Sequence, residues 1–197
     1  CGSKTFITNG PQADVILVFA MTDRAKGHKG ITAFLVPTDA KGFSRGRADE
    51  KVGIRASGSC TVFFEECFVP QRCRLGQVGE GFKVAMSTLD GGRIGIAAQA
   101  LGIAVAAYQE ALAYAKERKA FGQPIAQFQA IQFMLADMAT ELDAARLLVW
   151  RAASMQDKGV RHSAESAMAK LYASEMCERV TSKAIQIHGG YGYVKEY

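Results

Sequence analysis

The sequence predicts an α+β protein in which a β-rich domain precedes a bundle of α-helices. Residues 4–70 consist of short β-prone runs joined by glycine-containing turns. From residue 82 onward the chain is rich in Ala, Leu, Met, Glu, Lys and Gln, which favour helices. The glycine-bearing segment 76–81 lies where the two compositions meet. We therefore expect a β domain over residues 1–78 and a helical bundle over residues 79–197.

The β-rich part contains runs of strand character separated by turn signals. The runs are residues 4–8, the nearly continuous apolar stretch 14–22, residues 31–37 and residues 59–70. Asn9-Gly10 and the polar segment 26–30 are the turns, and a charged, glycine-bearing stretch fills residues 41–55. Short strands joined in this way favour an antiparallel sandwich or barrel.

Long helices are expected over about residues 82–119, 126–158 and 163–188. Ser163 is a candidate N-cap of the third helix, and Gly189-Gly190 mark its end. On the second helix, apolar residues recur at three- and four-residue spacing, which predicts a stripe buried in an antiparallel bundle: Ile131, Leu135, Met138, Leu142, Ala145, Val149 and Ala152.

Glycines inside the first predicted helix are unexpected, because each lowers the stability of the helix by about 1 kcal/mol relative to alanine. For Gly95 and Gly102 we expect tight helix–helix packing. For the segment Asp90-Gly91-Gly92-Arg93 we favour a ligand site, in which the charged pair holds a polar ligand and the bare helix leaves room for its chain.

Composition narrows the classes of function. The net charge of +5 comes from 24 basic and 19 acidic residues that are interspersed, without the dense basic stripe of a nucleic-acid-binding protein. No uninterrupted apolar run is long enough to span a bilayer, so we expect no membrane span. The five cysteines form no C-x-x-C pair and no Cys/His cluster, which predicts reduced thiols and no metal site. The three histidines share no context and are expected to be structural or on the surface.

Several segments in a fixed order together resemble the acyl-CoA dehydrogenases. They are Phe6-Ile7-Thr8-Asn9, then residues 53–57 (GIRAS) leading to Pro70, residues 79–86 (GEGFKVAM), residues 118–122 (RKAFG) with 129–132 (QAIQ), and residues 186–193 (QIHGGYGY). The Asp-Gly-Gly-Arg form of residues 90–93 most resembles the short-chain, butyryl-CoA type branch.

The resemblance implies an N-terminal helical domain, a middle β domain and a C-terminal four-helix bundle. This chain, which opens without Met, would be a fragment that carries most of the β domain and three of the bundle helices. The N-terminal domain, the first flavin-contacting strand and the last bundle helix would lie outside it.

The resemblance also implies an FAD site. Phe6 and Thr8 match positions that line the flavin ring, with the Thr8 hydroxyl near its reactive N5. Arg118 and Gln129 match residues that bind the FAD pyrophosphate and adjacent groups across a subunit boundary. Phe121 is either core or packed on the cofactor. Without the resemblance, Thr8 is an ordinary strand residue and Arg118 a solvated arginine near a helix end.

Two further sets of residues follow from the resemblance. Residues 186–190, including Gln186, Gly189 and Gly190, match a segment that contacts the FAD of a neighbouring subunit, although the glycine pair is also a helix C-cap. Asp90, Gly91, Gly92 and Arg93 match acyl-CoA-contacting positions.

The residue at position 92 bears on the catalytic base. Some branches of the family place the catalytic Glu there, and here it is Gly. The base is therefore expected beyond Tyr197, in a Tyr-Glu-Gly-Thr segment, and Glu196 is not assigned that role.

The implied activity is FAD-dependent α,β-dehydrogenation of a short-chain acyl-CoA thioester to the trans-2-enoyl-CoA. A Glu would remove the α-proton while the β-hydrogen leaves as hydride. Electrons would pass to an electron-transfer flavoprotein, and the enzyme would be a homotetramer, cytoplasmic in bacteria or in the mitochondrial matrix in eukaryotes. The alternatives are an acyl-CoA oxidase, a nitroalkane-oxidase-like enzyme, or a non-catalytic bundle protein that keeps the flavin fold.

Overall fold

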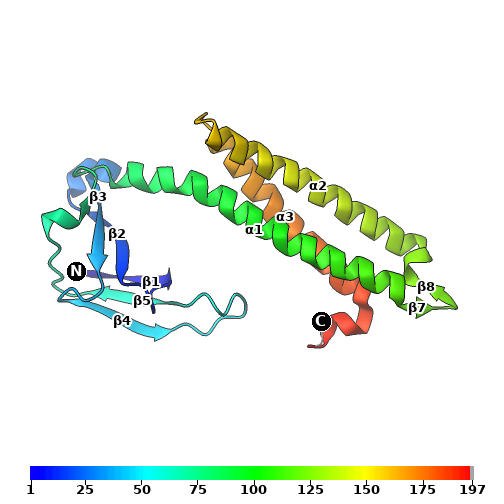
Figure 1. The fold of residues 1–197 in the computed structure, drawn as a ribbon. Helices are drawn as coiled ribbons and strands as arrows, with labels where there is room; N and C mark the ends of the chain where they lie inside the picture. Colours follow the sequence, from blue (N-terminus) through cyan, green and yellow to red (C-terminus); the bar gives the residue numbers. More distant parts are fainter. Residues whose placement is uncertain (196–197) are drawn as a thin grey trace. The chain divides into compact units, whose positions relative to one another are not determined.

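The computed structural model describes residues 1–195, and the chain divides into two compact units, residues 1–86 and residue 87 onward (Figure 1). The first unit is built mainly of β-sheets and the second mainly of helices, which confirms the predicted α+β class. Contacts divide the chain inside the first helix, whereas composition changes before it, so the domain boundary at residue 78 stays a prediction.

The first unit contains two antiparallel three-stranded sheets. One has the order β1 (Gly2–Thr8), β5 (Ser59–Phe64), β4 (Phe43–Ala48), and the other the order β2 (Val15–Met21), β3 (Ile31–Pro37), β6 (Arg74–Leu75). The 3-10 turns η1 (Arg24–Gly30) and η2 (Gln71–Cys73) complete it. β2 and β3 pair without interruption from Val15–Pro37 to Met21–Ile31, whereas both pairings of β5 contain a register shift.

The six-residue strand β4 was not predicted. β4 lies inside the charged stretch 41–55, and it is an edge strand that pairs with β5 alone. Charged residues such as Arg45 and Arg47 are tolerated there because an edge strand faces solvent on one side. The run predicted over 59–70 is also shorter in the structure, since the strand ends at Phe64 and Glu66 has φ 48°.

The second unit is a bundle of three long helices, α1 (Gly81–Glu117), α2 (Gln129–Asp157) and α3 (Ser163–His188). A short hairpin, β7 (Lys119–Ala120) and β8 (Gln123–Pro124), and the turn η3 (Ile125–Gln127) join α1 to α2. The turn η4 (Gly189–Tyr193) follows α3 directly. The helix limits agree with the predicted ones to within three residues.

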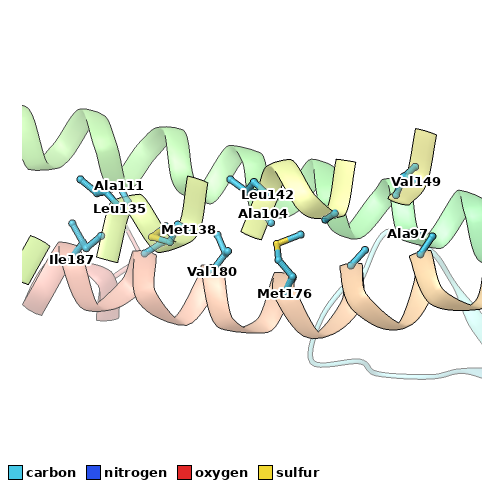
Figure 2. Packing of buried hydrophobic residues seen from close by; sticks show 14 of the residues in the cluster. Ala97, Ala104, Ala111, Leu135, Met138, Leu142, Val149, Met176, Val180 and Ile187 are labelled. Atoms are coloured by element: carbon cyan, nitrogen blue, oxygen red, sulfur yellow. The ribbon is translucent and has the colours of Figure 1, made fainter. Parts of the chain in front are cut away.

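The bundle core combines mostly alanines on α1 with alanines and larger apolar residues on α2 and α3 (Figure 2). Ala97, Ala104 and Ala111 are spaced by seven and fully buried, so they form a seam along α1. Met138 of α2 and Met176 of α3 are the largest fully buried side chains. The predicted α2 stripe is confirmed: six of its members are buried, and Ile131 packs against the same cluster.

Two sequence expectations about the helices are wrong. Ser163 is the first residue of α3 rather than its cap, which is His162, and its hydroxyl donates to Asp90 Oδ2 instead. Gly95 and Gly102 do not mark tight packing within this chain, because a Cβ built on either would meet no atom of the described residues within 4 Å. The end of α3 is as predicted, with Gly189 at φ 61° in the cap.

By length and composition alone, α1 is the one helix of the described residues that is long and apolar enough to cross a membrane. One such helix is weak evidence, since a core helix of a soluble protein meets the same criterion. Asp90 and Arg93 near its start and its buried alanine seam identify α1 as a bundle helix.

Candidate functional site

A pocket of about 600 Å³ lies at the end of the bundle where α1 stops and η4 begins. Its lining comes from the C-terminal ends of α1 and α3, from the residue after the short hairpin, and from η4. The lining residues are Tyr114, Arg118, Ile125, Ile187, His188, Gly189, Gly190, Tyr191 and Val194.

Aromatic rings form one part of this pocket. His188 is buried, its Nδ1 lies 2.8 Å from the carbonyl oxygen of Ala184, and its ring stacks on Tyr114 with centroids 4.6 Å apart. The Tyr191 ring lies 6.4 Å from that of Tyr114. The helix-end backbone and the stack together fix the His188 ring.

The charge in the pocket comes from Arg118, which directly follows α1. Its backbone N–H donates to the Tyr114 carbonyl and its own carbonyl accepts from Ile125 N–H, each at 2.8 Å. Its guanidinium carbon lies 5.7 Å from the centre of the Tyr191 ring, which is cation–π distance. The residue remains exposed, so an anionic ligand has access to this cation.

The Gly189-Gly190 backbone forms the remaining wall. Gly189 adopts φ 61° and ψ −131°, a conformation that side-chain-bearing residues rarely take. A Cβ built on Gly190 would meet nothing within 4 Å in the described residues, so bare backbone is exposed to the pocket. Such a surface allows a ligand to approach the main chain closely.

The Asp90–Arg93 segment forms a second polar cluster within the bundle unit. Arg93 Nη1 donates to Asp90 Oδ1 at 2.8 Å, and Ser163 Oγ donates to Asp90 Oδ2 at 2.5 Å. The Ser163 hydrogen bond is the largest cause of the lowered pKa of Asp90; burial opposes it as the second-largest effect, and the Arg93 charge adds to the lowering. A Cβ on Gly91 would lie 3.6 Å from the Gln156 amide, and one on Gly92 would meet open space.

The β unit carries the third set of predicted residues. Phe6 has φ 58° where the β1–β5 register shifts between Lys4 and Ile7, and it is 75% exposed. Thr8 is exposed at the end of β1, where it pairs with Ser59. An exposed phenylalanine in a left-handed conformation is uncommon and is typical of functional positions.

Comparison with known proteins establishes the family. The model of the acyl-CoA dehydrogenase C-terminal domain matches residues 79–197, and that of the acyl-CoA dehydrogenase middle domain matches residues 1–67. The chain belongs to the acyl-CoA dehydrogenase family.

Similar proteins come from both bacteria and mitochondria. The chain is 53% identical over 195 residues to the mitochondrial short-chain specific acyl-CoA dehydrogenase of Bos taurus, covering 99% of this chain and 47% of the relative. It is 51% identical over 196 residues to subunit CarC of the caffeyl-CoA reductase–Etf complex of Acetobacterium woodii, covering 100% and 52%. The structure of butyryl-CoA dehydrogenase from Megasphaera elsdenii matches with a TM-score of 0.97 at 51% identity, covering 100% and 51%. This acyl-CoA dehydrogenase chain thus spans about half the length of the curated relatives it matches.

The end pocket brings together only some of the predicted FAD residues of this acyl-CoA dehydrogenase chain. Arg118, Gly189 and Gly190 line it, whereas Gln186, exposed on the last turn of α3, and Gln129, exposed at the start of α2, do not. Phe121 is 97% exposed at φ 50° and contacts Phe128 edge to face at 6.2 Å, so its interpretation as core is wrong within this chain. Glu196 lies outside the described residues.

Tyr114 was not singled out from the sequence, and His188 and Tyr191 were named only as members of the motif 186–193, although all three line the pocket. The position of Tyr114 four residues before Arg118 is the one signal that indicated a shared helix face. His188 is structural, as expected of the histidines, and it also lines the site.

The residues of the end pocket fit part of an FAD molecule. An exposed guanidinium suits phosphate oxygens, aromatic faces suit a planar ring, and a bare glycine backbone suits close approach by either. The described residues contain no group of three or more His, Cys, Asp or Glu side chains that would hold a metal ion.

Proposed function

We propose that the protein containing this chain is an FAD-dependent short-chain acyl-CoA dehydrogenase that converts acyl-CoA thioesters to trans-2-enoyl-CoA. The observation that carries the proposal is the end pocket, where an exposed arginine, aromatic rings and a bare glycine backbone meet in a chain of this family. The short-chain assignment is supported by the identity of about half to short-chain relatives and by the butyryl-CoA dehydrogenase structure.

The residues of the bundle have binding roles in this proposal. Arg118 binds a phosphate of the cofactor through its guanidinium, and the Gly189-Gly190 backbone allows the cofactor to lie against the main chain. Gln129, Phe121 and Gln186 contact adjacent parts of it.

The β unit carries the residues that would bind the ring system of the cofactor. Phe6 would contribute its exposed aromatic surface, and the exposed Thr8 hydroxyl would donate a hydrogen bond to the ring. FAD, when bound, supplies the acceptor for the hydride that leaves the β-carbon of the substrate.

Substrate binding involves Asp90, Gly91, Gly92 and Arg93. The open space around a Cβ at position 92 leaves room for the substrate, and glycine there supplies no base. The proton from the α-carbon is accepted by a glutamate beyond residue 197, whose pKa must suit removal of an acidified C–H proton.

Partners and assembly are part of the same proposal. The relative from Acetobacterium woodii is a subunit of an Etf complex, which supports an electron-transfer flavoprotein as the electron acceptor. A homotetramer with FAD sites shared between subunits would place the end pocket of one chain against the cofactor of another. The compartment follows the source, cytoplasm in bacteria and mitochondrial matrix in eukaryotes.

A specific observation favours a second candidate, the reverse reaction. The Acetobacterium woodii relative is named as a reductase at an identity within two percentage points of the mitochondrial dehydrogenase. Reduction of an enoyl-CoA uses the same binding residues, so the two directions differ in the electron partner and the reduction potential.

The test is an anaerobic titration of the purified full-length protein with butyryl-CoA, followed at the oxidised flavin absorption band. Bleaching supports dehydrogenation of a short acyl thioester, and rapid recolouring by oxygen instead of by an electron-transfer flavoprotein indicates an oxidase. Recolouring of the reduced protein by caffeyl-CoA but not by crotonyl-CoA favours the reductase. A protein that binds no flavin would refute the cofactor assignment and favour a non-catalytic role.

A further inference from the structure

The hydroxyl of Ser163 forms a hydrogen bond with a residue of α1 rather than with its own helix. Serine near a helix start normally accepts a hydrogen bond from a backbone N–H and so caps the helix. The N-terminus of α3 has no side-chain cap bond, and Ser163 Oγ instead donates to Asp90 Oδ2 at 2.5 Å across the bundle. Instead of capping its own helix, Ser163 makes a contact with a residue 73 positions away in the sequence.

With this contact, each oxygen of the Asp90 carboxylate accepts a hydrogen bond. Arg93 Nη1 donates to Oδ1 at 2.8 Å while Ser163 holds Oδ2, so each carboxylate oxygen already has a strong donor. The Asp90 side chain is 23% exposed and that of Arg93 is 39% exposed. The Arg93 guanidinium is therefore the more accessible of the two charged groups for a ligand.

Arg93 retains donors for that purpose. Within residues 1–195 its hydrogen-bond partner is Asp90, through Nη1 alone, and a guanidinium has five N–H donors in a rigid fork. Gly92 beside it is exposed, and a Cβ there would meet open space. An anionic or carbonyl oxygen of a ligand lying along the bare helix would reach the rest of the fork.

We propose that Ser163 is a positioning residue for acyl-CoA: through Asp90 it fixes the Arg93 fork that binds the polar part of the thioester substrate. The proposal rests on the proposed function, since acyl-CoA is the ligand of the Asp90–Arg93 segment. Ser163 itself touches neither the substrate nor the reacting atoms.

The electrostatics agree with this arrangement. The Ser163 bond is the largest cause of the lowered pKa of Asp90, followed among the favourable causes by the charge of Arg93 and its hydrogen bond and then by His162. The groups that face the carboxylate are thus Arg93 on α1 and His162 and Ser163 at the start of α3. Asp90 stays ionised at neutral pH, and the Arg93 fork is held at every physiological pH.

The experiment compares Ser163→Thr with Ser163→Val in the full-length protein, because the threonine and valine side chains have nearly the same shape and differ in the hydroxyl. We expect Ser163→Val to raise the KM for butyryl-CoA and the Kd for crotonyl-CoA about tenfold, with kcat changed less than about twofold. Ser163→Thr should remain within about twofold of the parent in both. Ser174→Ala, whose hydroxyl bonds to the Leu171 carbonyl of its own helix, is the matched control and should change neither.

Several results would overturn the proposal. An unchanged KM in Ser163→Val, an equal loss in the threonine and valine variants, or a lower melting temperature and flavin content with KM unaltered would make Ser163 purely structural. If Ser163→Val does not fold, Ser163→Ala is measured against the same limits. A parent protein that binds flavin but is not bleached by butyryl-CoA and does not bind crotonyl-CoA would instead refute the proposed function.

Discussion

The two ends of the helical bundle present charge in opposite ways. At the end near η4, Arg118 is exposed beside Tyr191 and a bare glycine backbone. Near the start of α3, Arg93 is already bonded to Asp90, which Ser163 holds in turn. Arg93 and Arg118 are 25 residues apart, or about 38 Å of helix. One arginine is thus left without an acidic partner in the described residues, whereas the other is oriented in advance by the chain.

The largest effect is expected from removing Arg118, the cation of the end pocket that has no acidic partner within the described residues. Arg118→Ala in the full-length protein should weaken FAD binding about ten- to a hundredfold, because a charge-assisted hydrogen bond contributes about 1.5–3 kcal/mol. Flavin content after dialysis and FAD titration of the apoprotein measure this. Arg146→Ala, which removes a half-exposed arginine paired with Asp143, is the control. If both variants retained flavin equally, Arg118 would not be a cofactor-binding residue, and the two ends would not differ in this way.

A pair of alanine substitutions separates strain from ligand contact at the same end. Gly189→Ala forces a side chain into φ 61°, which costs about 1–3 kcal/mol of stability, whereas Gly190→Ala meets no atom within 4 Å in the described chain. We expect Gly189→Ala to lower the melting temperature, and Gly190→Ala to leave it unchanged but to reduce FAD affinity severalfold. If Gly190→Ala binds FAD like the parent, the ligand does not approach the backbone there.

The end of the bundle that carries Asp90 predicts a pH dependence of stability. The pKa of Asp90 is lowered from 3.8 in the fold, so its contribution to stability is present above that value and is lost as the pH falls through the lower, folded pKa. Stability of the parent should therefore decline more steeply than that of Asp90→Asn between about pH 5 and pH 3. Urea unfolding over this range measures the difference, and parallel curves would mean that the carboxylate is not held as described.

The smallest effect is expected from removing an ion pair in the middle of the bundle, between the two ends. Glu141 on α2 accepts from Arg179 at 2.7 Å and Lys183 at 3.5 Å on α3, as exposed or half-exposed ion pairs. Glu141→Gln should cost about 0.2–1 kcal/mol, and less at high salt, without altering FAD affinity or the KM for acyl-CoA. A change in either ligand parameter would show that the ends are coupled through the middle of the bundle.

The sequence predicted the features that local signals determine, and it missed features that depend on contacts between distant segments. The α2 stripe and the end of α3 were correct because periodicity and glycine caps are local signals. β4 was missed because pairing with β5, rather than its charged sequence, makes it a strand. The domain boundary remains untested for the same reason, since contacts and composition change at different residues.

The site shows the same limit. Arg118 and the Gly189-Gly190 pair were found through motifs, but the stack of Tyr114 on His188 joins residues far apart in the sequence. Ser163 was interpreted as a cap because the rule for helix starts does not see Asp90 on another helix. The left-handed conformation of Phe6 follows from the irregular β1–β5 pairing, and nothing in the local sequence indicates it.

The alanine seam of α1 fixes which face of the helix is turned toward the bundle core. Ala97, Ala104 and Ala111 return to the core every seven residues, and each inserted residue rotates the remainder of the helix by about 100°. Adding or deleting a single residue between Arg93 and Arg118 would therefore turn one arginine away from its site even if the bundle refolded. Lengthening the helix by one seven-residue step would keep the seam facing the core and would add about 10 Å between Arg93 and Arg118.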